Sequence, residues 1–171
     1  LSTIHEPKTL QAAGQVLLDS DLHQELGQTY LKMANSLMEA ARVLGLGDQA
    51  ARGQLEGVHK LQAEELTDIT FGSFLLLLTE QCLSGLTDLN LSRSNVTGPR
   101  MASLSNAILA GRLAKCQYLQ LRHNSINDAD MHLLSGAVRK MPKLRELWLQ
   151  ANRIGDEGMK ALVDAVREGN E

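Results

Sequence analysis

The residue types that most often perform chemistry are few and scattered in this sequence of 171 residues. Its two cysteines, Cys82 and Cys116, do not form a C-x-x-C pair, and its five histidines lack the spacing of metal ligands. Two cysteines are also too few for a disulfide framework, so we interpret both as small buried apolar residues in a reducing compartment. The sequence therefore predicts no metal site and no disulfide scaffold.

Motifs that hold phosphate or activate a nucleophile are weak or absent. The segment Gly45–Gly47 is a shortened version of a dinucleotide-binding loop, but it follows a helical pattern instead of a strand. No G-x-x-x-x-G-K-[ST] or H-E-x-x-H motif occurs. Helix capping explains the acidic residues of the turns without catalysis, at Asp128, Asp130, Asp156 and Glu157. We expect no catalytic residue and no cofactor, and we predict that the protein is not an enzyme.

Leucine dominates the composition, at 32 of the 171 residues, whereas aromatic residues make up only 3%. Such a core favours helices or leucine-spaced repeats over a β-sandwich. The net charge of −3 argues against a dedicated nucleic-acid-binding protein. The longest apolar run, 74–78, is too short to cross a membrane, and no signal peptide is visible, although the sequence does not begin with Met. We expect an intracellular location, in the cytoplasm or the interior of an organelle.

Three segments of the C-terminal half repeat one pattern of apolar residues. They are 86–96 (LTDLNLSRSNV), 116–126 (CQYLQLRHNSI) and 144–154 (LRELWLQANRI), and their starts lie 30 and 28 residues apart. Each segment is followed by a polar turn and a stretch with the apolar period of a helix. Alternating leucines predict a short strand that buries every second side chain, and a repeated strand–turn–helix unit must stack on its neighbours to complete a core.

The shared pattern L-x-x-L-x-L-x-x-N-x-I/V resembles the leucine-rich repeat family, in its ribonuclease-inhibitor-like class. The resemblance covers about residues 86–171 and continues in degenerate form from about residue 66. Ser94 replaces the usual Asn of the first copy, and Cys116 replaces the first Leu of the second. The family implies an α/β fold, a right-handed solenoid with parallel strands on its concave face and helices on its convex face. It also implies that Asn124 and Asn152 form a ladder of hydrogen bonds between neighbouring repeats.

The first 60 residues have a different, helical pattern. A short helix is expected around 9–18, and a longer one follows cap-type residues at 19–21 and ends at Gly45 or Gly47. A third helical piece is expected over 49–61. Residues 74–82 match the outer helix of a degenerate repeat, whose strand should lie near 55–61. We predict a helical N-terminal region or cap, 1–60, and a solenoid, 61–171, that is truncated at its C-terminus.

If the paired leucines of each strand point inward, the residues between them point outward on the concave face. Stacking the repeats then aligns these residues in rows. The predicted partner-binding residues are Asp88, Tyr118 and Glu146 in one row, Asn90, Gln120 and Trp148 in the next, and Ser92, Arg122 and Gln150 in the third. Tyr, Trp and Arg are common anchors in protein interfaces, which favours a binding surface.

Two features leave alternatives open. Trp148 could instead pack on its row neighbours or on the N-terminal helices. The basic residues Arg139, Lys140, Lys143 and Arg145 suit the C-terminal end of a helix, but they could also face an anionic partner.

Three functional hypotheses follow from the repeats. The first is a non-catalytic protein–protein interaction module or scaffold that uses the concave face. The second is a structural accessory subunit wedged into a large assembly. The third is a regulator of a nucleotide-dependent enzyme such as a GTPase, because relatives of this repeat class include GTPase activators. Each predicts a protein partner in a larger complex, and none predicts nucleic acid or a membrane span.

Overall fold

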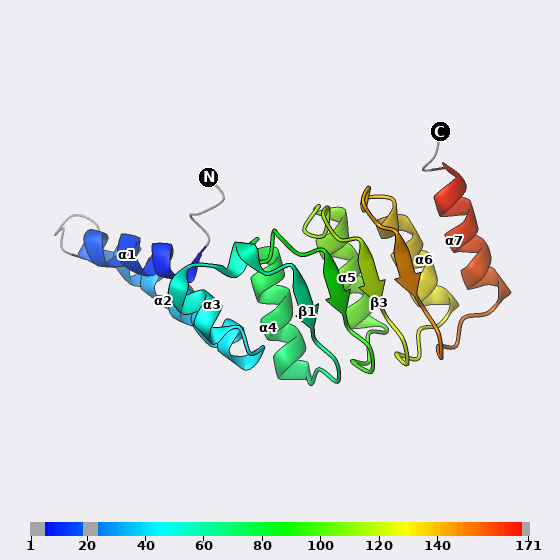
Figure 1. The fold of residues 1–171 in the computed structure, drawn as a ribbon, viewed down its shortest axis with the longest axis horizontal. Coiled ribbons are helices and arrows are strands. Elements are labelled where there is room, and N and C mark those ends of the chain that lie inside the picture. The colour runs from blue at the N-terminus through cyan, green and yellow to red at the C-terminus, as the bar shows by residue number, and fades with distance from the viewer. Residues whose placement is uncertain (1–5, 19–23, 169–171) are drawn as a thin grey trace. The chain divides into compact units, whose positions relative to one another are not determined.

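A computed structural model describes residues 6–18 and 24–168 of the chain, with the side chains of 17–18 and 24–27 left aside. Helices and strands follow one another in the order shown in Figure 1. The helices are α1 (Pro7–Leu18), α2 (Gln24–Val43), α3 (Gly47–Arg52), α4 (Asp68–Thr79), α5 (Pro99–Leu109), α6 (Asp128–Val138) and α7 (Asp156–Glu168). The strands are β1 (Lys60–Gln62), β2 (Asp88–Asn90), β3 (Tyr118–Gln120) and β4 (Glu146–Trp148).

The chain divides into two compact units. The first unit contains the described residues up to Val58 together with Ile69–Gly85. The second contains His59–Asp68 and the described residues from Leu86 onward. All four strands therefore belong to the second unit, whereas α1 to α3 and almost all of α4 belong to the first.

The first unit is helical because its apolar residues recur at three- and four-residue steps. α1 packs along α2, and both contact the short α3. Ala34, Leu37 and Ala41, which follow these steps, are fully buried on one face of α2. α2 ends at Val43, and Gly45 follows it in the left-handed region at φ 74°, which fits the predicted glycine stop. The predicted cap residues 19–21 lie outside the described residues.

The expectation of a helix over 49–61 is wrong for most of that range. α3 ends at Arg52 because Gly53 adopts φ 67° and its N–H bonds back to Ala50 and Gln49. A single 3-10 turn, Leu55–Gly57, follows, and β1 begins at Lys60. The strand of the degenerate repeat therefore lies at the very end of the range expected for it, 55–61, and runs one residue beyond. The outer helix expected over 74–82 is α4, which starts earlier and ends at Thr79.

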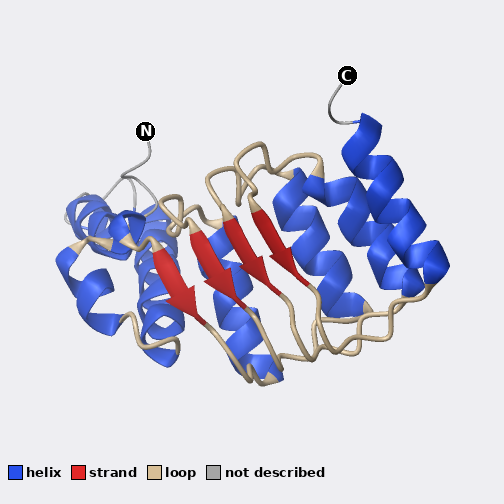
Figure 2. Ribbon diagram, turned by 45° about the vertical axis from the view of Figure 1, so that its right-hand side comes forward, coloured by secondary structure: helices blue, strands red, loops and turns tan. Residues whose placement is uncertain are grey.

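The second unit is built on one parallel sheet with the strand order β1-β2-β3-β4. Figure 2 shows the four strands side by side and pointing the same way. In the register, Leu61, Leu89, Leu119 and Leu147 align as one row. This register confirms the predicted repeat and adds β1 to it as a first, degenerate copy.

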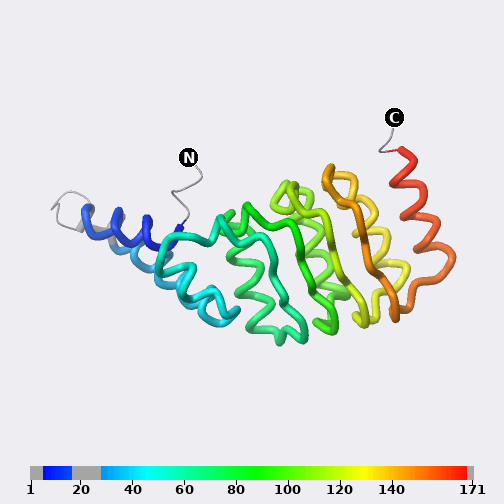
Figure 3. Tube along the Cα trace, in the orientation of Figure 1, coloured from blue at the N-terminus to red at the C-terminus, as the bar shows by residue number. Residues whose placement is uncertain are grey.

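Helices connect successive strands of the second unit, as the Cα trace shows (Figure 3). α6 packs against α5 on one side and α7 on the other, so these helices form a layer of their own beside the sheet. Leu89, Leu91, Leu119 and Leu121 are fully buried, together with Met101, Leu104 and Met131 from the helices. Alternation in the strands and the helical period thus supply the two sides of one core.

A ladder of side-chain hydrogen bonds fixes the turns after the strands. The Oδ1 atom of Asn124 accepts from the backbone N–H groups of Ser94 and Val96 at 2.9 and 3.0 Å, and its Nδ2 donates to the carbonyls of Leu91 and Arg122 at 2.9 and 3.2 Å. Asn152 makes the equivalent bonds one repeat further on. Its Oδ1 accepts from the backbone N–H groups of Asn124 and Ile126, and its Nδ2 donates to the carbonyls of Leu121 and Leu149. The ladder implied by the family resemblance is therefore confirmed at both asparagines.

Ser94 continues this ladder where the pattern lacks Asn. Its hydroxyl oxygen accepts from the N–H of Leu66 at 3.1 Å, and its O–H donates to the carbonyl of Ala63 at 3.1 Å. The shorter side chain makes fewer bonds than Asn, but it reaches the neighbouring turn. The substitution thus preserves the link between the first two repeats.

Both cysteines are buried and unpaired, as predicted. Burial raises the pKa of the Cys82 thiol to about 12, and nearby acidic groups, Glu6 first among them, add to the shift. Burial likewise raises the pKa of Cys116 to about 12. Thiols of this kind are inert apolar residues rather than nucleophiles.

Candidate functional site

The concave face of the second unit carries the predicted rows in the predicted register. Asp88, Tyr118 and Glu146 align across the strands, as do Asn90, Gln120 and Trp148. One position further along, the Nε–H of Arg122 donates to Oε1 of Gln150 at 2.9 Å, which places these two residues side by side. The rows are therefore confirmed as neighbours in space, while their role in binding stays a prediction.

On β2, hydrogen bonds between side chains leave little of the concave face exposed. Asn90 and Ser92 are only 5% and 7% exposed. The Nδ2 of Asn90 donates to Gln62 at 2.8 Å and to Glu64 at 2.5 Å, and its Oδ1 accepts from the hydroxyl of Ser92 at 2.7 Å. Of the predicted residues, these two offer the least surface to a partner.

Tyr118 and Gln120 form the open centre of the face on β3. Both side chains are half-buried. Within the described part of the chain, neither the Tyr118 hydroxyl nor the Gln120 amide has a hydrogen-bond partner. Half-buried polar groups without internal partners remain available to an external donor or acceptor.

Four side chains, two on β4 and two just after β3 and β4, form a cluster beside this centre, which we call the Arg122–Trp148 cluster. The guanidinium carbon of Arg122 lies 4.0 Å from the centre of the Trp148 ring. The Nε1–H of Trp148 donates to Oε2 of Glu146 at 2.8 Å, and Arg122 in turn bonds to Gln150. Trp148 does pack on neighbouring residues, as the alternative interpretation held, yet its ring stays half-buried rather than entering the core.

The first strand extends the face beyond the predicted residues. Lys60, Gln62 and Glu64 are exposed on β1 and just after it, and Lys60 lies 3.6 Å from Asp88. Sequence reasoning missed them because the first repeat has Ala63 and Leu66 where the others have Leu and Asn or Ser. The spacing of 28 residues could have located this strand, because it aligns Val58, Leu61 and Ala63 with Leu86, Leu89 and Leu91 of the next repeat.

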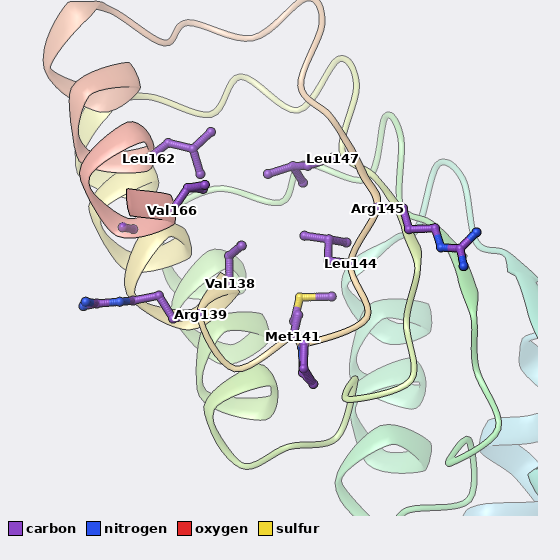
Figure 4. Close-up of a pocket in the computed structure, with 10 residues that line it drawn as sticks. Val138, Arg139, Met141, Leu144, Arg145, Leu147, Leu162 and Val166 are labelled. Carbon is purple, nitrogen blue, oxygen red and sulfur yellow. The ribbon is translucent and has the colours of Figure 1, made fainter. Parts of the chain in front are cut away.

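A second surface, which we call the end groove, lies between β4 and α7. It has a volume of about 550 Å³ and is lined mostly by apolar side chains. Figure 4 shows Leu147, Leu162 and Val138 pointing into it, while Arg139 and Arg145 point away. Leu144, Leu147 and Leu149 are half-buried here, whereas their equivalents in the two preceding repeats are fully covered. Within the described residues, nothing covers this face of the last repeat.

The basic cluster at the end of α6 does not form one site. Arg139 forms an ion pair with Glu168. Lys140, Lys143 and Arg145 are exposed. The paired Arg139 weakens the alternative that this cluster faces an anionic partner.

The acidic residues of the turns serve the helices. Asn127 caps α6 by accepting from the N–H of Asp130, whose side chain accepts in return from the N–H of Asn127. Asp128 accepts from the N–H groups of Gly155 and Gly158 at 2.7 and 3.1 Å. Over the described ranges, no group of three or more His, Cys, Asp or Glu side chains could hold a metal ion. None of the helices in these ranges is long and apolar enough to span a membrane.

Known proteins share the repeats of this chain. A family model described as Leucine Rich repeat matches residues 140–163. Ribonuclease inhibitor of Mus musculus is 33% identical over 88 residues, which is 52% of this chain and 19% of the relative. Ribonuclease inhibitor of Sus scrofa is 33% identical over 89 residues, 52% of this chain and 18% of the relative.

The chain thus spans about a fifth of the length of these relatives. No solved structure matches it. The family match, the two relatives and the parallel sheet agree with the repeated sequence pattern and with the asparagine ladder. The repeats of this chain are therefore leucine-rich repeats similar to those of ribonuclease inhibitors, and they form an α/β solenoid.

Proposed function

We propose that this chain is a non-catalytic protein–protein interaction module that binds its partner on the concave strand face. The observation that carries the proposal is the open centre, where Tyr118 and Gln120 are half-buried without internal hydrogen bonds beside the Arg122–Trp148 cluster. Aromatic and Arg side chains dominate the energy of protein interfaces, and a rigid sheet presents them without an ordering cost. The two relatives are named as inhibitors of ribonuclease, itself a protein, which supports a protein partner.

Affinity purification from the native source with a matched pair of variants tests this proposal. Gln120→Lys places a charge in the open centre, and Asn106→Lys makes the same chemical change on an exposed position of α5. A protein recovered in stoichiometric amount with the unaltered chain should be lost with Gln120→Lys and retained with Asn106→Lys. Loss with Asn106→Lys alone would place the interface on the helical side and contradict the proposal.

The end groove favours a second candidate function, a structural accessory subunit of a larger assembly. The half-buried Leu144 and Leu147 resemble a core face that another chain could cover. For this function, Leu147→Glu should release the chain from its assembly while Gln120→Lys has no effect. The opposite pattern supports the concave face.

The remaining predictions belong to the same proposal. The partner is a protein rather than a nucleic acid, and the chain needs no cofactor. A reducing, intracellular compartment suits two cysteines that are free and buried. A division into a helical region, 1–60, and a solenoid, 61–171, suits a rigid binding surface, and Asp88, Asn90 and Ser92 would act at its periphery.

A further inference from the structure

We propose that Arg122 is the receptor for a carboxylate of the partner, so that the concave face selects an acidic protein segment. This inference rests on the proposed function, because it names the partner chemistry of the same surface. Other side chains contact the Arg122 guanidinium on its face and at Nε, whereas its Nη1 and Nη2 atoms make no hydrogen bond to another described residue.

Two contacts restrain Arg122. The guanidinium stacks on the Trp148 ring, 4.0 Å from its centre, and the Nε–H donates to Gln150 at 2.9 Å. Trp148 is itself restrained, because its Nε1–H donates to Glu146 at 2.8 Å. A long side chain normally loses rotamer freedom when it binds a ligand, and here much of that loss has already occurred on folding.

A carboxylate that approaches the end of the Arg122 guanidinium binds the two terminal nitrogens, Nη1 and Nη2. In the described part of the chain, Nη1 and Nη2 make no hydrogen bond to another residue, and the approach through Nε is occupied by Gln150. Two parallel N–H groups in one plane match the two oxygens of a carboxylate. Tyr118 and Gln120 lie on β3, which ends two residues before Arg122, and they offer further polar groups to the backbone of such a segment.

A carboxylate fits this site better than a phosphate dianion. Arg122 is the one cation of the Arg122–Trp148 cluster, and Glu146 places a negative charge at the edge of the same ring. Phosphate sites usually bring several cations or a helix N-terminus together. A singly charged carboxylate needs one guanidinium, and it meets less repulsion from Glu146.

Trp148 makes the site directly observable, because it is the only tryptophan of the chain. Short random peptides would be selected by display against the whole chain, and each recovered peptide would be resynthesised with every Asp and Glu replaced by Asn and Gln. Titration of Trp148 fluorescence then gives the affinity of both forms. Arg122→Gln is the test variant, and Arg167→Gln is the matched control on the exposed end of α7.

We expect the selected peptides to be acidic and to bind about tenfold more tightly than their amide forms, as charge-assisted bidentate pairs do. On Arg122→Gln the two forms should bind alike, whereas Arg167→Gln should leave the difference unchanged. The inference is overturned if Gln120→Lys abolishes peptide binding but Arg122→Gln does not, an outcome that leaves the proposed function standing. Tighter binding of phosphoserine forms would overturn it in favour of a phosphate. If no selected peptide is sensitive to Gln120→Lys, the proposed function fails and the inference fails with it.

Discussion

The backbone N–H of Asn124 donates to the side-chain oxygen of Asn152 at 2.9 Å, across the boundary between two repeats. Asn124 in turn accepts from the turn of the repeat before it. Each asparagine thus satisfies three backbone groups in the turn of the preceding repeat and one carbonyl in its own repeat. The concave face depends on this ladder, because the turns fix where the strand residues point.

Asn124→Ala should destabilise the second unit strongly. Asn124 is 1% exposed and makes four hydrogen bonds, so its loss leaves buried backbone groups without partners. We expect a loss of about 2–4 kcal/mol in the free energy of unfolding, measured by urea denaturation. Asn152→Ala should cost less, because Asn152 is half-buried, and Asn106→Ala on the exposed side of α5 serves as the control. Equal effects at positions 124 and 106 would contradict the role of the ladder.

Two glycines should respond oppositely to replacement by alanine. A Cβ at Gly158 would lie 2.6 Å from Oδ1 of Asp128, 3.0 Å from Cγ2 of Ile154 and 3.1 Å from the Cβ of Met131, so these three neighbours must move. A Cβ at Gly136, within α6, would meet nothing within 4 Å. Gly158→Ala should therefore lower the free energy of unfolding by about 1–3 kcal/mol. Gly136→Ala should raise it by about 0.5–1 kcal/mol, because alanine favours the helix. Thermal denaturation of both variants checks the pair, and a loss at Gly136 would count against the described packing.

The sequence predicts most of the second unit because its repeats carry the same information several times. The inward leucines, the outward rows and the asparagines at 124 and 152 follow from one spacing, and the strand register agrees with it. The pattern of the first strand is weaker, because Ala63 and Leu66 stand where the other repeats have Leu and Asn or Ser, and because Gly53 ends the preceding helix early. Burial of Asn90 could not be predicted, because the side chains of Gln62 and Glu64 accept hydrogen bonds from it across the repeat boundary. Stacking of Arg122 on Trp148 likewise depends on rotamers that spacing does not specify.

Glu6 gives the first unit a defined dependence on pH. Its side chain is 4% exposed, and its pKa is raised above the ordinary value of 4.5, first by burial and then by the nearby charge of Glu56. A raised pKa in the folded state means that protonated Glu6 favours folding, and that this stability is lost as pH rises through the folded pKa.

Glu6→Gln should therefore be more stable than the unaltered chain near neutral pH, by about 1 kcal/mol, because the amide keeps an acceptor for the N–H of Glu56. The advantage should shrink as pH falls through the raised pKa of folded Glu6 toward about 4.5, and below that pH it should be lost because Glu6 is protonated in both states. Melting temperatures measured across this pH range, with the exposed Glu39→Gln as control, test the sign. A stability advantage of Glu6→Gln that grows as pH falls would show that the folded state favours the ionised form of Glu6 instead.

Both thiols should resist alkylation while the chain is folded. Burial raises the pKa of Cys82 and Cys116 to about 12, so at pH about 8 the thiolate fraction is about a thousandfold lower than for a free cysteine. Iodoacetamide labelling followed by mass spectrometry should modify neither residue under native conditions and both in urea. Rapid native labelling of Cys116 alone would indicate that the second unit opens locally.

The most direct measurement of the central claim is site-specific photo-crosslinking in an extract of the native source. A benzophenone side chain would replace Gln120 in the open centre of the concave face, and Leu133, which is 45% exposed on α6, in a control chain. If the concave face binds the partner, irradiation should give a discrete adduct with one protein at position 120 and none at position 133. An adduct at position 133 with none at position 120 would contradict the claim.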